Sequence, residues 1–166
     1  MTDLTFKIDR NDKPLIYVDS GENTPTSCLI DTGANMPVWF VGEDYLSFRF
    51  PDATFMNKKT FLTGIGKEPL LDIPVWEIPE FVLTGDNNEK ITFKNVPIAV
   101  INTNKFSFDM IIPLTMLNRM NMSFLYMESA NHGAFRLSAS KNVFFVRPIY
   151  NPGNRYLNKI QIFTEG

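Results

Sequence analysis

Short apolar or alternating segments, separated by turn-forming residues, run along most of the chain. Turn signals such as "TGDNNE" and "NPGNR" lie between them. The segments recur about every 8 to 12 residues, which is the spacing of an all-β barrel or sandwich. The expected strands cover residues 4–10, 14–20, 27–31, 60–64, 72–78, 80–85, 90–95, 97–102, 123–128, 134–139, 142–147 and 159–164.

One stretch departs from this pattern. In "PLTMLNRMNM", Leu114, Leu117 and Met120 recur near helical spacing, and Pro113 precedes them where a first-turn proline is favourable. We therefore predict one short α-helix near residues 113–121. The chain shows no long linker, internal repeat or low-complexity segment, so we expect residues 1–166 to form a single domain.

Composition narrows the classes of function. The chain has 166 residues, 44% hydrophobic and 20% charged, with a net charge of −2. With this charge balance we expect no basic stripe that could bind nucleic acid or anionic lipid. No apolar run approaches the roughly 20 residues that span a bilayer. The single cysteine, Cys28, excludes an internal disulfide and favours a reducing, cytoplasmic compartment. The single histidine, His132, lies in the turn-like "SANHGAF" and is best interpreted as a surface residue.

The stretch "SCLIDTGANMPVWF" carries the candidate chemistry. Asp31 follows an apolar strand, and the chain after its Thr-Gly turn returns to apolar residues. Holding a carboxylate beside a core costs several kcal/mol unless it is shared or hydrogen-bonded, which is typical of a functional group. The sequence also contains a related triplet, Asp19-Ser20-Gly21, but polar residues follow it, and we interpret that copy as a solvated hairpin turn.

At these residues the sequence resembles the retropepsin-like aspartic proteases. "LIDTGA" is similar to the catalytic loop of that family, "LTGIGKE" to its glycine-rich flap, and "FDMIIPLTMLNRMNMSF" to the strand and short helix that close the protomer. The resemblance covers roughly residues 5 to 125, and the remaining C-terminal residues extend beyond a minimal retroviral protomer. It implies an acid-protease barrel that hydrolyses peptide bonds, without a metal or other cofactor.

The resemblance also implies roles for the catalytic loop. Asp31 would be the catalytic carboxylate, paired with Asp31 of a second copy because the chain contains no convincing second catalytic loop. Thr32 would hold the two loops together across the dimer axis, Gly33 would allow the tight turn, and Ala34 stands where pepsin-like enzymes often have serine. The expected partners are a second copy and a peptide or protein substrate.

The flap assignment rests on Gly64, Ile65 and Gly66, which would form the tip of a hairpin that closes over substrate. Two residues depart from the pattern of the family. Lys67 replaces the usual third glycine of the flap, and Pro113 replaces the glycine that usually follows the apolar pair of the last motif. An ordinary hairpin with a glycine bulge is the alternative for residues 64–66.

The sequence is also compatible with other classes of protein. The chain could be a non-catalytic, dimeric β-barrel binding module derived from a protease, and Pro113 is the best argument for that alternative. A serine or cysteine hydrolase built on Cys28 or a serine with His132 fits poorly, because Cys28 lies inside an apolar strand. A metal site is weaker still, since one histidine provides no cluster of ligands.

Overall fold

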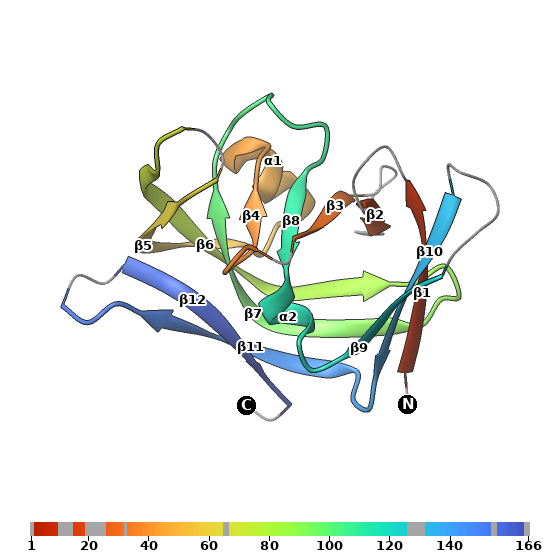
Figure 1. Ribbon diagram of the computed structural model, residues 1–166. Helices are drawn as coiled ribbons and strands as arrows, with labels where there is room; N and C mark the ends of the chain where they lie inside the picture. Colours follow the sequence, from red (N-terminus) through yellow and green to blue (C-terminus); the bar gives the residue numbers. More distant parts are fainter. Residues whose placement is uncertain are drawn as a thin grey trace.

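The computed structural model describes residues 2–9, 15–18, 26–31, 33–64, 67–125, 132–153 and 156–164. These ranges contain many strands and two short helices (Figure 1). The elements are β1 (Thr2–Asp9), β2 (Leu15–Val18), β3 (Thr26–Asp31), β4 (Val38–Trp39), α1 (Gly42–Arg49), β5 (Thr54–Leu62), β6 (Leu70–Thr84), β7 (Lys90–Val100), β8 (Met110–Pro113), α2 (Leu114–Leu117), β9 (Asn121–Leu125), β10 (His132–Ala139), β11 (Val143–Tyr150) and β12 (Tyr156–Phe163). The predicted all-β fold is therefore confirmed.

All the strands belong to one hydrogen-bonded sheet that curls on itself. Its order is β11-β12-β5-β6-β7-β4-β8-β3-β2-β1-β10-β9, and β11 also pairs with β7. The pairs from β7 through β6, β5, β12 and β11 back to β7 close a five-stranded barrel. Closure removes the free edges that a sheet would otherwise expose. The predicted barrel is thus present, and its last two strands come from the C-terminal extension.

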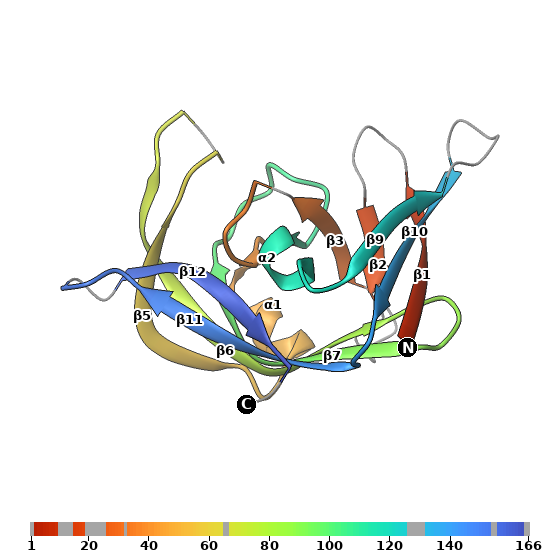
Figure 2. The same cartoon turned by 60° about the horizontal axis from the view of Figure 1, so that its bottom comes forward.

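The other end of the sheet is an antiparallel arm. β1 pairs with β10 along its whole length, from Thr2↔Ala139 to Asp9↔His132, and β9 pairs with the other side of β10. Figure 2 shows this arm on the side of the molecule opposite to the β5–β6 hairpin. The rings of Phe6 and Phe135 stack at 6.4 Å between centroids, and both are buried. This contact joins β1 and β10 within the arm.

Four strands, β4, β8, β3 and β2, lie between the barrel and the arm. β8 lies between β3, with which it runs parallel, and β4, with which it runs antiparallel. β4 also pairs in parallel with β7 of the barrel, so this crossing joins the two parts of the sheet. Cys28 and Trp39 on the crossing strands are fully buried, and the Trp39 Nε1–H donates to the Gly42 carbonyl at 2.9 Å.

The prediction that the segments now seen as β6 and β7 are each interrupted was wrong. Both strands continue where the sequence indicated an interruption, at Pro79 and near Asn95. These two residues lie between the register pairs Ile78↔Val96 and Glu80↔Lys94. Asn95 has a φ of 60° and lies beside Pro79, which has no N–H to donate. The ladder is therefore locally irregular at these two residues, but neither strand ends there.

The helix content also differs from the prediction. The helix expected near residues 113–121 is present but covers only Leu114–Leu117, because the chain enters β9 at Asn121. The prediction of a single helix was wrong, since α1 forms over Gly42–Arg49. His132 begins β10, although its surroundings indicated a turn; residues 126–131 lie outside the described ranges. Within those ranges, no helix is long and apolar enough to cross a membrane.

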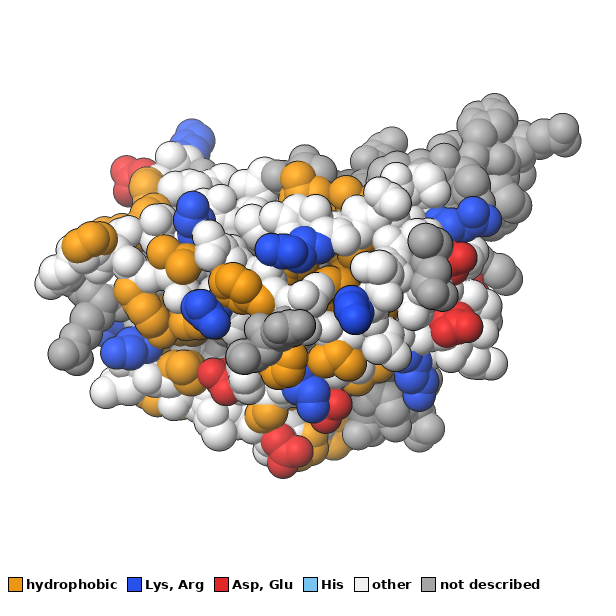
Figure 3. Space-filling view, turned by 90° about the horizontal axis from the view of Figure 1, so that it is seen from below, with side chains coloured by type: hydrophobic (Ala, Val, Ile, Leu, Met, Phe, Trp, Pro, Cys, Tyr) orange, Lys and Arg blue, Asp and Glu red, His pale blue; other side chains and the backbone are white. Residues whose placement is uncertain are grey.

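The C-terminal hairpin β11–β12 forms the outer wall of the barrel. In Figure 3, Lys and Arg side chains lie among apolar ones on the face seen from below. The Arg147 guanidinium lies 4.3 Å from the centre of the Phe163 ring, and the Lys58 ammonium lies 5.5 Å from that of Tyr150. These cation–π contacts cover aromatic surface on the hairpin while the charges stay in water.

The barrel closes where β12 meets β5. This parallel pairing contains only Tyr156↔Lys59 and Leu157↔Thr60. The buried Thr60 hydroxyl supplements it by donating to the Leu157 carbonyl at 2.7 Å. A side-chain hydrogen bond therefore reinforces a short ladder.

Replacement of this hydroxyl should weaken the closure. We expect Thr60→Val to lower the free energy of unfolding by about 1–2 kcal/mol, because the buried Leu157 carbonyl loses a donor. Thr54→Val, at an exposed position of the same strand, should change it by less than about 0.5 kcal/mol. Urea unfolding followed by fluorescence measures both. Equal effects of the two substitutions would contradict a role for the Thr60 hydroxyl in closure.

Candidate active site

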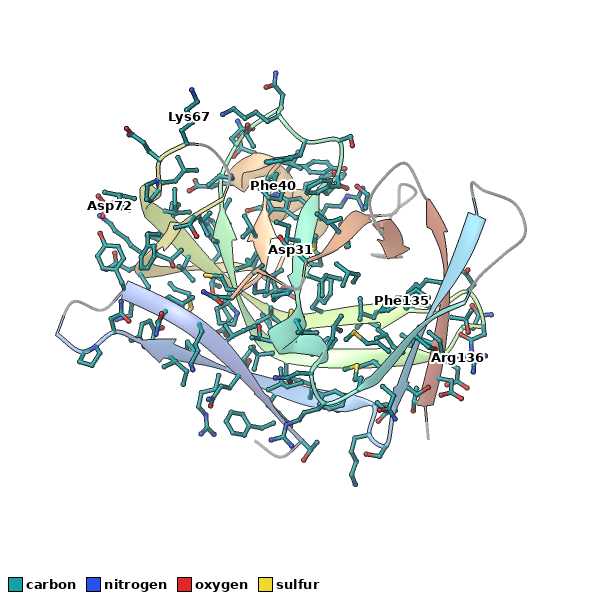
Figure 4. The ribbon with its side chains drawn as sticks, viewed as in Figure 1. Asp31, Phe40, Lys67, Asp72, Phe135 and Arg136 are labelled. Atoms are coloured by element: carbon teal, nitrogen blue, oxygen red, sulfur yellow. The ribbon has the colours of Figure 1, made fainter. Side chains whose placement is uncertain are left out.

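Asp31 is the last residue of β3 and lies near the middle of the molecule (Figure 4). The parallel pairing of β3 with β8 runs from Cys28↔Met110 to Asp31↔Pro113. Cys28, Ile30 and the residues of β8 are buried, whereas Asp31 is partly exposed. The apolar strand thus carries the carboxylate to the edge of the core, as the sequence pattern predicted.

Pro113 lies beside Asp31 in this register. β8 keeps its pairing with β3 through Pro113, and α2 begins at the next residue. Proline at the end of a strand costs little, because no further ladder hydrogen bond is needed from it. β8 therefore stays paired with β3 behind Asp31 although it ends in proline.

The turn after Asp31 folds back on the carboxylate. The Gly33 N–H donates to Asp31 Oδ1 at 2.9 Å, and the Ala34 N–H donates to the Asp31 carbonyl at 3.3 Å. A Cβ added to Gly33 would lie 3.4 Å from Oδ1, in ordinary van der Waals contact. The Thr115 hydroxyl donates to the Asn35 carbonyl at 3.3 Å and so links the turn to α2. Thr32 lies outside the described residues.

Asp31 lines a cleft of about 370 Å³ that has an aromatic wall. Phe40, Phe106 and Phe108 form this wall. Their ring centroids are 4.9 Å apart for Phe40–Phe106, 5.5 Å for Phe40–Phe108 and 5.2 Å for Phe106–Phe108. Phe40 and Phe108 are almost fully buried, so Phe106, which is only partly buried, presents most of the accessible ring surface of this wall. Such a surface favours a large apolar group.

The opposite side of the cleft comes from the barrel. It contains the end of β5 and the residues after it, Thr60 to Gly64, together with Asn158 of β12. Gly64 has a φ of 84°, a left-handed conformation that glycine adopts without strain. Ile65 and Gly66 lie outside the described residues. Lys67 is exposed on the far side of the tip and points away from Asp31 (Figure 4).

Asp31 is the only charged residue among the described residues that line the cleft. The described ranges also bring together no group of three or more His, Cys, Asp or Glu side chains that could hold a metal ion. A larger cavity, of about 460 Å³, lies around Arg49, whose buried guanidinium donates to Tyr45 and Thr26. That cavity is not lined by Asp31, and these hydrogen bonds give Arg49 a structural role.

Cys28 does not have the environment of a nucleophile. It is fully buried, and burial raises the pKa of its thiol well above the ordinary value, with the nearby Asp109 acting in the same direction. A thiol must ionise to attack, so this environment keeps Cys28 inert. A cysteine hydrolase built on Cys28 would therefore lack a reactive nucleophile.

The sequence did not indicate the residues that complete the cleft. Phe106 and Phe108 alternate before β8 in "KFSFDM", a signal of one apolar face that could have marked them as a wall. No local signal identifies Asn158, because its strand reaches the cleft only through the pairing of β12 with β5.

No protein-family model and no curated protein matches this chain. Among solved structures, it is similar to a retropepsin-like aspartic protease from Rickettsia conorii, with 16% identity and a TM-score of 0.47. The alignment covers 81% of this chain and 89% of that one. A likeness at this distance assigns no activity to this chain.

Proposed function

We propose that the chain is an aspartic endopeptidase in which Asp31 activates a water molecule for attack on a peptide bond. One observation carries the proposal: a single carboxylate, at the end of a buried strand, is the only described charge in a cleft that has an aromatic wall. The cleft is wide enough for a side chain, and its aromatic wall can bind an apolar one beside the carboxylate.

Peptide hydrolysis by aspartates requires two carboxylates that share one proton. The ionised member removes a proton from water, while the protonated member hydrogen-bonds to the scissile carbonyl. Two full negative charges about 4 Å apart repel by about 4 kcal/mol at an effective dielectric constant near 20, so one proton stays between them. The Gly33 N–H donates to Asp31 Oδ1 at 2.9 Å and so holds the carboxylate in place.

A second copy of the chain would provide the second carboxylate. No other acidic residue of the described part lines the cleft, so a lone protomer lacks the partner that the reaction needs. In a homodimer with two-fold symmetry the same residue meets itself at the axis. Asp31 of each subunit would lie there, and Thr32 would hydrogen-bond across the axis.

The β5–β6 hairpin would act as a flap. Gly64 lies at the rim of the cleft in a conformation that favours glycine, and Gly66 would give the tip a second point of flexibility. Ile65 would then cover the bound peptide as the hairpin closes and excludes water from the carboxylates.

Asp31→Asn tests the proposal directly. We expect a loss of peptide cleavage by about 10³-fold or more, because an amide can neither accept the proton of the water nor share one with its partner. Cleavage sites in a synthetic peptide library, mapped by mass spectrometry, provide the measurement. Asp3→Asn, at an exposed position of β1, is the matched control and should retain wild-type activity.

The outcomes separate an enzyme from a binding module. Cleavage by the wild-type chain and by Asp3→Asn, with loss only in Asp31→Asn at unchanged assembly, supports the dyad. If the wild type and Asp31→Asn bind library peptides equally and neither cleaves them, the chain is the non-catalytic module and the proposal fails.

Ala34→Ser should alter the pH dependence. Ala34 lines the cleft near Asp31, and a hydroxyl there could donate to the carboxylate and favour its ionised form. We expect the acidic limb of the pH–rate profile to move to lower pH in the variant. A profile that does not move, or an acidic limb that moves upward, would show that residue 34 has no hydrogen bond to the ionised pair.

A further inference from the structure

The C-terminal hairpin contributes one residue to the cleft of Asp31. Asn158, on β12, lines the same cavity as Asp31 and the aromatic wall. It is exposed, and its side-chain amide makes no hydrogen bond to another residue in the described ranges. A polar group is therefore available to a bound molecule on the side of the cleft opposite to the phenylalanines.

The strand that carries Asn158 is held firmly on both sides of the residue. The Leu157 carbonyl accepts from Thr60, and the Tyr156 hydroxyl donates to Asp72 of β6. This hydrogen bond to Asp72 raises the pKa of Tyr156, so the hydroxyl keeps the proton that it donates. Further along β12, the Ile162 carbonyl accepts from Arg119 at 3.1 Å. A recognition group on such a strand keeps its position when substrate binds.

We propose that Asn158 is a specificity-determining residue of the protease proposed above: it hydrogen-bonds a neutral polar group of the substrate next to the apolar residue that packs on Phe106. A primary amide both donates and accepts, so it matches a peptide group or an Asn, Gln, Ser or Thr side chain. It lacks the charge to select a lysine or a glutamate. The C-terminal extension thus completes the substrate site as well as the barrel.

Asn158→Asp tests this role, because the variant keeps the size of the side chain but replaces its donor with a negative charge. We expect library sites with Lys or Arg at one position near the scissile bond to gain about two- to fivefold in kcat/KM relative to sites with Gln there. The Asn121→Asp variant, exposed on β9 and outside the cleft, introduces the same charge and should keep the wild-type profile.

The results distinguish this inference from the proposed function on which it rests. If the wild type cleaves the library and Asn158→Asp gives the wild-type site profile, Asn158 does not contact substrate and only the inference fails. The inference also fails if Asn121→Asp shifts the profile equally, since net charge would then be the cause. A wild type that cleaves nothing overturns the proposed function, and the inference with it. Unfolding midpoints in urea confirm that the variants compared are folded.

Discussion

The parallel pairing of β3 with β8 is the interaction on which the site depends. It places Asp31 beside Pro113 at the end of two buried strands, and it brings Ile111 into the cleft. Because β8 also pairs with β4, the same crossing positions Phe40, which follows β4 directly. The two ladders that β8 forms thereby position both the carboxylate and part of its aromatic wall. β4 joins them to the barrel through its pairing with β7.

A lone carboxylate in such a cleft has a limited set of chemical uses. With a metal it could be a ligand, but the described part of the chain brings no set of ligands together. With a cation it would form an ion pair, yet no described Lys, Arg or His lines the cleft. Pairing with a second carboxylate through a shared proton requires neither, and Asp31 is partly exposed at the end of β3.

Local features were predictable from the sequence, and features that depend on distant pairing were not. The position of Asp31 and the turn at Gly33 depend on a few neighbouring residues. The pattern of polar and apolar positions was therefore sufficient to predict them. α1 was missed because its apolar residues do not form one face: Leu46 is buried, whereas Phe48 is 62% exposed. Asn158 reaches the cleft only because β12 pairs with β5, almost a hundred positions earlier in the chain.

Mixing of subunits shows whether each active site needs Asp31 from two chains. Wild-type and Asp31→Asn chains are unfolded together, refolded at constant total protein and assayed for peptide cleavage as their ratio is varied. If two chains share one site, activity follows the square of the wild-type fraction and falls to about one quarter in an equal mixture. A linear decline, to about one half in the equal mixture, would show that each chain works alone and would contradict the account.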